Sequence, residues 1–91
     1  MNTKTEDNYS VYMVCCADDT YYTGIATDVE HRIMVHNSGK GAKYTRSRLP
    51  VHLVYKEEGL TKSEALKREL EIKDLTRKEK EALIQGSKQG Q

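Results

Sequence analysis

Two short runs of β-forming residues, separated by four residues typical of a turn, constrain the fold of this chain most strongly. The first run, residues 9–16, reads Tyr-Ser-Val-Tyr-Met-Val-Cys-Cys, and the second covers residues 21–26. Ala17-Asp18-Asp19-Thr20 lies between them. Tyrosine and valine favour strands, whereas aspartate favours turns. The sequence therefore predicts a β-hairpin close to the N-terminus.

Three Thr-x-x-Glu patterns predict the starts of three helices, because a threonine and a glutamate at this spacing form a capping box. They begin at Thr27, Thr61 and Thr76. We expect helices that end near residues 38, 75 and 84, and a third strand over residues 51–56. The order β-β-α-β-α-α predicts an α+β fold, a small three-stranded antiparallel sheet with helices packed against it.

The length of the chain allows one hydrophobic core. A chain of 91 residues, 32% of them charged, forms a single domain with a small core. We expect this domain over residues 9–85, a disordered segment over residues 1–8 and a polar tail over residues 86–91. No apolar run suits a signal peptide or a membrane span. The adjacent Cys15 and Cys16 suit neither a disulfide framework nor a thiolate zinc site, so we expect a cytoplasmic protein.

Positive charge is concentrated in the middle of the sequence. Residues 31–56 hold six basic residues and no acid, although the whole chain carries a net charge of only +1. A block of one sign attracts a polyanion. Within it, the glycine-rich segment 38–50 resembles a surface that contacts phosphates. The candidate nucleic-acid-binding residues are Lys40, Lys43, Arg46 and Arg48.

Candidate catalytic side chains come from the hairpin and the first predicted helix. Tyr12 and Tyr22 lie in the two strands of the hairpin. Each could handle a proton at a wet site, or could be a half-buried core residue with a satisfied hydroxyl. Arg32 and His36 are four residues apart and share a helix face. They could bind a phosphate and move a proton, or they could be solvated surface residues.

Glu69 interrupts the apolar face of the second long helix. Its helical neighbours are Ala65, Leu66 and Ile72, whereas Glu71 neighbours charged residues. A carboxylate that turns inward needs a metal ion, a cation or several donors as its partner. Glu69 is therefore a candidate metal ligand, or one half of an ion pair with Arg68, Lys73 or a lysine of the basic loop.

These residues, in this order, resemble the GIY-YIG nuclease superfamily, in particular its small single-domain bacterial members. Ser10-Val11-Tyr12 and Tyr22-Thr23-Gly24 stand at the two motifs that give the superfamily its name. Ser10 replaces a glycine and Thr23 an isoleucine. The likeness spans residues 9–84 and includes His-Asn-Ser-Gly-Lys-Gly-Ala-Lys-Tyr-Thr-Arg at 36–46. Residues 76–84 lack the late asparagine that many of these nucleases carry.

The resemblance implies a metal-dependent endonuclease that cleaves phosphodiester bonds in DNA, with repair or recombination as its setting. Its implied catalytic residues are Tyr12, Tyr22, Arg32, His36 and Glu69. Glu69 would hold Mg²⁺ or Mn²⁺, and either tyrosine could be the general base. A protein partner could help to select the target. The alternatives are a non-catalytic nucleic-acid-binding module that uses the basic segment 31–56, and an adaptor for a protein partner that uses the charged helices over residues 62–81.

A single phosphate must touch the metal, the arginine and the base at once, so these groups must converge. We therefore expect Tyr12 and Tyr22 on one face of the sheet, as facing or diagonal neighbours. Arg32 and His36 should point to the same face, Glu69 should reach it from its own helix, and the loop 39–48 should border the resulting pocket.

Overall fold

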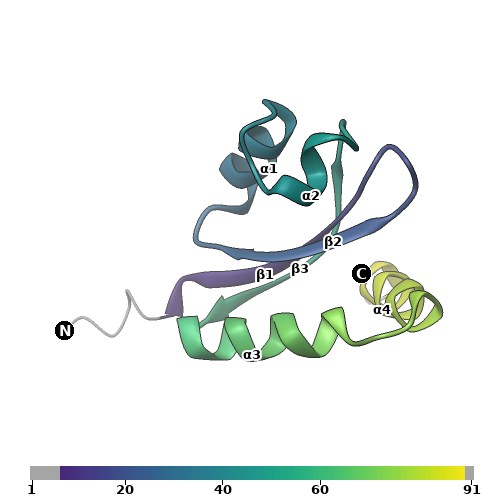
Figure 1. The fold of residues 1–91 in the computed structure, drawn as a ribbon. Helices are drawn as coiled ribbons and strands as arrows, with labels where there is room; N and C mark the ends of the chain where they lie inside the picture. Colours follow the sequence, from purple (N-terminus) through teal and green to yellow (C-terminus); the bar gives the residue numbers. More distant parts are fainter. Residues whose placement is uncertain (1–6, 90–91) are drawn as a thin grey trace.

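A computed structural model describes residues 7–89, which form a three-stranded sheet and four helices (Figure 1). The strands are β1 (Tyr9–Cys15), β2 (Tyr21–Ala26) and β3 (His52–Leu60), and they are antiparallel in the order β2-β1-β3. The helices are α1 (Val29–Asn37), α2 (Lys43–Arg46), α3 (Lys62–Lys73) and α4 (Arg77–Gln89). The α+β fold predicted from the sequence is confirmed.

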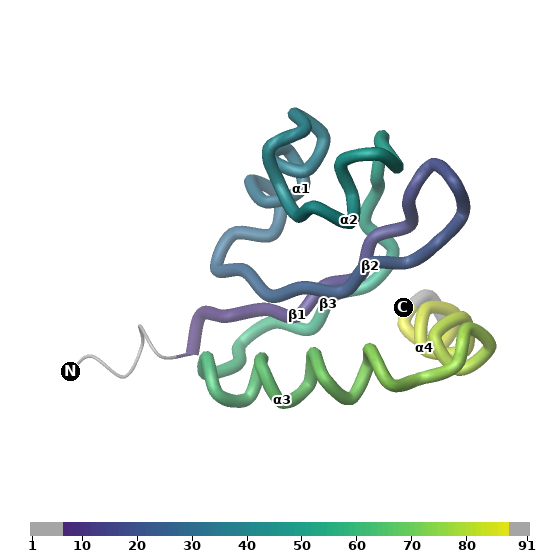
Figure 2. Tube along the Cα trace, in the orientation of Figure 1, coloured from purple at the N-terminus to yellow at the C-terminus, as the bar shows by residue number. Residues whose placement is uncertain are grey.

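The helices cover both faces of the sheet, with α1 and α2 on one side and α3 and α4 on the other (Figures 1 and 2). The central strand β1 is buried from Ser10 to Val14, because its side chains alternate between two apolar layers. Tyr12 and Val14 pack with Val29 from the start of α1, whereas Met13 packs with Ile72 of α3. The sheet therefore has a distinct side chain layer on each face.

The helix starts agree with two of the three predicted capping boxes. The Thr61 hydroxyl accepts from the backbone N–H of Glu64 at 3.0 Å, while the Glu64 carboxylate accepts from the N–H of Thr61 at 2.9 Å. The same reciprocal pair joins Thr76 and Glu79. The prediction at Thr27 is wrong, because Asp28 caps α1 and accepts from the N–H of His31 at 3.0 Å. A carboxylate at the N-cap serves as well as a hydroxyl.

Three other boundaries differ from the sequence predictions. The segment 38–50 contains the short helix α2, which begins without a side-chain cap. Strand β3 continues to Leu60 rather than ending at residue 56, and α4 continues to Gln89 rather than to residue 84. Of the segment predicted to be disordered, residues 1–6 lie outside the described residues, as do residues 90–91 of the predicted tail. No helix within residues 7–89 has the length and apolar character that crossing a membrane requires.

Candidate active site

Tyr12 and Tyr22 lie on the same face of the sheet, as the sequence predicts. The register of β1 and β2 places Val14 opposite Tyr22 and Tyr12 opposite Gly24. Directly opposed residues share a face, and so do residues two apart on one strand. The two tyrosines are therefore diagonal cross-strand neighbours, on the face that α1 and α2 cover.

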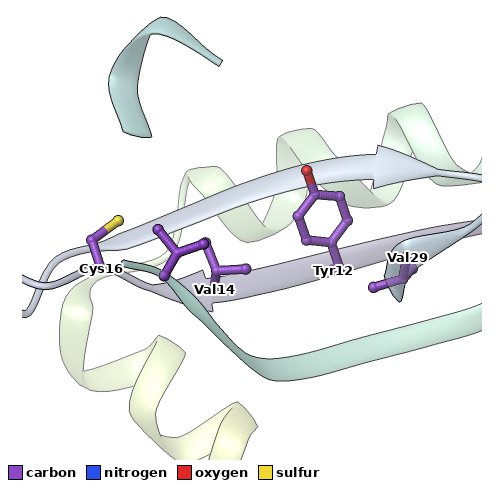
Figure 3. Packing of buried hydrophobic residues seen from close by; sticks show 5 residues of the cluster. Tyr12, Val14, Cys16 and Val29 are labelled. Carbon is purple, nitrogen blue, oxygen red and sulfur yellow. The ribbon is translucent and has the colours of Figure 1, made fainter. Parts of the chain in front are cut away.

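Gly24 lets the ring of Tyr12 pass closely over β2. A Cβ atom at residue 24 would lie 2.7 Å from the Tyr12 hydroxyl oxygen and 3.0 Å from Cζ, both too close for unstrained packing. Figure 3 shows the ring standing on β1 between Val14 and Val29, with its hydroxyl directed toward the neighbouring strand. Because β2 is an edge strand, this places the hydroxyl near the open edge of the sheet.

His36 anchors the Tyr12 hydroxyl from α1. Its side chain is fully buried, and Nε2 lies 2.7 Å from the tyrosine oxygen. The other ring nitrogen, Nδ1, lies 3.0 Å from the Thr45 hydroxyl of α2. Gly41 packs directly against the imidazole, since a Cβ there would lie 2.5 Å from Nδ1. The basic loop therefore closes over the histidine, and the expectation that residues 39–48 border the site is confirmed at Gly41 and Thr45.

The hydrogen bonds around His36 assign its tautomer. Burial, and secondarily the charge of Arg32, lower the pKa of His36 below its ordinary value of 6.5, so the ring is neutral at pH 7. The Thr45 hydroxyl donates to the carbonyl of Ala42 at 2.9 Å, which leaves its oxygen to accept from Nδ1–H. The contact that would favour the other tautomer, from the N–H of Ala42 to Nδ1, is longer at 3.5 Å. We therefore assign Nε2 as the acceptor of the Tyr12 hydroxyl proton.

The Tyr12 hydroxyl is influenced by the other four candidate residues. Burial raises its pKa to about 12, and the charges of Tyr22 and Glu69 act in the same direction. A hydrogen bond and the charge of Arg32 oppose this rise. Of the four, His36 makes direct contact at 2.7 Å, and the other three act on the pKa of the hydroxyl. The phenol is protonated at neutral pH in the absence of a further cation.

Glu69 reaches this site from the opposite layer of the fold. Helix α3 runs beneath β1 and β2 (Figure 2), and only 16% of the Glu69 side chain is exposed. Its carboxylate pairs with Lys73 at 3.2 Å, one of the cations that the sequence offers as a partner. Its charge also contributes to the raised pKa of Tyr12, which lies in the central strand β1. Glu71 lies more exposed and pairs with Arg68, as expected for a solvated acid.

The four basic candidates of the loop differ in their surroundings. Lys40, Lys43 and Arg46 are exposed. Arg48 is partly buried, donates to Asp18 at 3.0 Å and stacks over the Tyr44 ring, 4.0 Å from its centroid. The first three therefore face solvent, whereas Arg48 holds the loop to the hairpin turn.

Sequence reasoning missed Thr45 and Tyr44, both in α2. Thr45 is fully buried against His36, and Tyr44 stacks on Tyr22 with ring centroids 5.9 Å apart. Both lie within a polar loop pattern that gives no sign of burial or of a helix. The basic, glycine-rich composition and the likeness to small relatives both marked this segment, but neither pointed to Tyr44 or Thr45.

Comparison with known proteins connects this geometry to a family. The family model described as the GIY-YIG catalytic domain matches residues 8–82. The chain belongs to the GIY-YIG family. The match covers β1, β2, α1 and α3, which carry the five converging side chains.

Bacterial relatives of this GIY-YIG protein share most of its length. A UPF0213 protein of Staphylococcus epidermidis is 58% identical over 79 residues, which cover 87% of this chain and 96% of that one. A UPF0213 protein of Staphylococcus aureus is 59% identical over 78 residues, 86% of this chain and 95% of the relative. These small proteins therefore correspond to this chain almost from end to end.

Two solution NMR structures have the same fold. The UPF0213 protein of Bacillus halodurans gives a TM-score of 0.55 at 48% identity, with 85% of this chain and 82% of that one covered. A protein of E. faecalis gives a TM-score of 0.58 at 41% identity, with 88% of each chain covered. The arrangement of sheet and helices is thus shared with experimental structures.

Proposed function

We propose that this protein is a metal-dependent endonuclease that hydrolyses phosphodiester bonds in DNA, in the setting of repair or recombination. The observation that carries the proposal is the buried Tyr12–His36 hydrogen bond, with Tyr22 packed against the His36 ring and the charges of Arg32 and Glu69 acting on the pKa of Tyr12. These residues come from four separate elements, so their meeting is not a consequence of sequence proximity. Membership of the GIY-YIG family supports the same chemistry.

The residues present fit a magnesium or manganese ion. Within residues 7–89 no group of three or more His, Cys, Asp or Glu side chains could hold a metal by itself. One carboxylate, completed by waters and phosphate oxygens, is nevertheless a usual arrangement for Mg²⁺. Glu69 would be that ligand, with Lys73 displaced from it. The ion would supply positive charge to the phosphate.

Arg32 and the Tyr12–His36 pair supply the protein's part of the reaction. The Arg32 guanidinium, beside the Tyr12 hydroxyl, would hold a phosphate oxygen and neutralise charge as the phosphorus becomes pentacoordinate. Tyr12 would accept a proton from the attacking water while its own proton passes to Nε2 of His36. This route avoids a free phenolate, which the raised pKa of Tyr12 makes unfavourable at neutral pH. It makes His36 transiently cationic, and the negative charge of the phosphate would offset the cost that burial and Arg32 impose on that cation.

A cleavage assay with a matched pair of variants tests this function. Supercoiled, single-stranded and branched DNA would each be incubated with the protein in Mg²⁺, in Mn²⁺ and in EDTA. We expect metal-dependent cleavage of at least one substrate, reduced about 100-fold or more in Glu69→Gln. Glu71→Gln, on the same helix, should cleave like the unmodified protein because the ion pair of Glu71 within residues 7–89 is with Arg68, outside the candidate site.

The same experiment separates the enzyme from the binding module. A module that only binds would leave every DNA intact with either metal. Its binding would survive Tyr12→Phe and Glu69→Gln, but would fall when the exposed Lys40, Lys43 and Arg46 are neutralised. That combination of results would replace the endonuclease proposal.

A further inference from the structure

A pocket at the outer edge of β2 adjoins the candidate active site. Its volume is about 300 Å³, and its lining residues are Tyr21, Tyr22, Thr23, Tyr44, Lys73 and Lys80. We propose that this pocket binds one unpaired nucleotide of a nucleic-acid strand, next to the phosphate that is cut. The proposal rests on the proposed function and names the substrate class: a strand with an unpaired nucleotide beside the cleavage point.

One wall of the pocket is aromatic and held in place by the fold. The rings of Tyr22 and Tyr44 are nearly parallel, with an interplanar angle of 20°. Tyr22 also packs edge-on against buried His36, and Arg48 lies over Tyr44. Tyr44 nevertheless remains 38% exposed. Aromatic side chains held in this way bind the faces or edges of nucleobases with little dependence on sequence.

The other wall of the pocket carries two ammonium groups and no acid. Lys73 comes from α3 and Lys80 from α4. Lys73 pairs with Glu69, whereas Lys80 makes no ion pair with any residue in the described range 7–89. Ammonium groups bind phosphate as point charges. An aromatic wall that faces two cations thus matches the two ends of a nucleotide, its base and its phosphate.

The size and position of the pocket favour an unpaired nucleotide over a paired one. Its volume lies at the lower end for small-molecule sites, which suits one nucleotide rather than a stretch of duplex. A base that enters between side chains must leave its stack, and this requires least energy when the base is already unpaired. Tyr22 belongs to both the pocket and the candidate active site, and Lys73 of the pocket pairs with Glu69 of the active site. The bound nucleotide therefore directly adjoins the scissile phosphate.

Equilibrium binding without cleavage tests the proposal. The probe is a fluorescein-labelled oligothymidylate of about ten nucleotides, a typical site size for single strands. Anisotropy is measured in EDTA, and a duplex of the same length serves as the comparison. We expect Tyr44→Leu to weaken strand binding about fivefold or more, while Tyr44→Phe, which keeps the ring, stays within twofold. An oligomer of the same length that carries abasic sites throughout should not distinguish Tyr44→Leu from Tyr44→Phe.

Lys80→Ala and Lys78→Ala form a second matched pair on α4. Lys80 lines the pocket and Lys78 does not. Lys80→Ala should weaken strand binding several-fold and reduce the slope of log K against log salt by about 0.7, the value for one phosphate contact on a single strand. Lys78→Ala should leave both quantities nearly unchanged, and the duplex should bind equally to both variants.

The outcomes distinguish the pocket from the proposed function. Equal strand binding by Tyr44→Leu and Tyr44→Phe, together with equal salt slopes for Lys80→Ala and Lys78→Ala, would overturn the pocket proposal, even if Glu69→Gln abolishes cleavage. The pocket proposal would also be overturned if duplex binding depended on Tyr44 and Lys80 as strongly as single-strand binding does. The expected binding differences in a protein that cleaves no DNA would support the pocket and refute the enzyme.

Discussion

The close approach of Tyr12 to Gly24 predicts the effect of a single added methyl group. An alanine at position 24 would bring its Cβ to 2.7 Å from the Tyr12 hydroxyl oxygen, 3.0 Å from Cζ and 3.2 Å from Cε1. The ring cannot swing away, because Tyr12 is 1% exposed and its hydroxyl is bound to His36. The strand or the ring must therefore shift, and the site must shift with it.

The change in stability caused by Gly24→Ala is the sum of two opposing contributions. Overpacking of a buried core costs about 1–3 kcal/mol in the free energy of unfolding. Replacing glycine by alanine within a strand returns about 0.5–1 kcal/mol, because the unfolded chain loses freedom. The two contributions combine to a net loss of about 0–2.5 kcal/mol, and the 2.7 Å contact in a site that cannot relax places Gly24→Ala at about 1–2 kcal/mol. This lowers the melting temperature by about 5–15 °C in a domain of this size.

A double-mutant cycle shows whether the Tyr12 hydroxyl is the cause. Tyr12→Phe removes the oxygen atom that makes the shortest contact and leaves the ring carbons at 3.0 and 3.2 Å. In the Tyr12→Phe background, Gly24→Ala should therefore cost about 0.5–1 kcal/mol less than in the unmodified protein. Urea unfolding measures all four corners of the cycle.

Gly86→Ala is the control for the glycine replacement itself. Gly86 lies within α4, and nothing lies within 4 Å of a Cβ at this position. This variant should be more stable than the unmodified protein by about 0.5–1 kcal/mol. If Gly24→Ala changes stability by less than about 0.5 kcal/mol, or costs the same with and without the Tyr12 hydroxyl, the close-packing argument is refuted.

Three further predictions concern hydrogen bonding and pH. Asn37→Ala should cost about 2 kcal/mol on urea unfolding, because the Asn37 amide both donates to and accepts from the backbone of Val51, at 3.0 and 2.7 Å; a loss below about 0.5 kcal/mol would contradict this. The lowered pKa of His36 means that the unfolded chain binds a proton near pH 6.5 that the folded chain does not, so stability should fall as the pH drops below about 6.5. In His36→Gln, the free energy of unfolding should depend less on pH below about 6.5. An unchanged pH dependence would refute a neutral, buried His36. The pKa of Tyr12, raised to about 12, adds stability that is complete below pH 10 and is lost as the pH rises from 10 toward 12. Between pH 10 and 12, Tyr12→Phe should therefore lose less unfolding free energy than the unmodified protein. An equal loss in the two proteins would count against a buried Tyr12 hydroxyl.

Strand parity and helix spacing predict much of the site from the sequence. The alternation of the hairpin puts Tyr12 and Tyr22 on one face, and the four-residue spacing puts Arg32 and His36 on one side of α1. Glu69 could be selected because its neighbours Ala65 and Ile72 are apolar, and both are fully buried in the structure. Strand alternation and helix spacing depend only on residues close in sequence, so they predict which side chains share a face wherever the strand or helix forms.

Other features depend on contacts between distant residues, and local patterns do not contain them. Thr45 is buried because α2 folds back over His36, and a threonine within a basic loop gives no sign of this. Thr27 and Asp28 are both good N-cap residues, so their order alone could not decide which one caps α1. Glu69 lies on α3 and Tyr12 on β1, so the influence of Glu69 on the pKa of Tyr12 depends on tertiary packing that no local pattern contains.

The single-turnover cleavage rate of a double variant, Tyr12→Phe with Glu69→Gln, tests whether Tyr12 and Glu69 act in one site. The two residues come from opposite layers of the fold, and the proposed mechanism needs both side chains in one catalytic unit. Residues of one catalytic unit have strongly non-additive effects on the rate. We predict that the double variant cleaves DNA about as slowly as the slower single variant. Rate losses that multiply, or a single variant that keeps the full rate, would contradict a shared site.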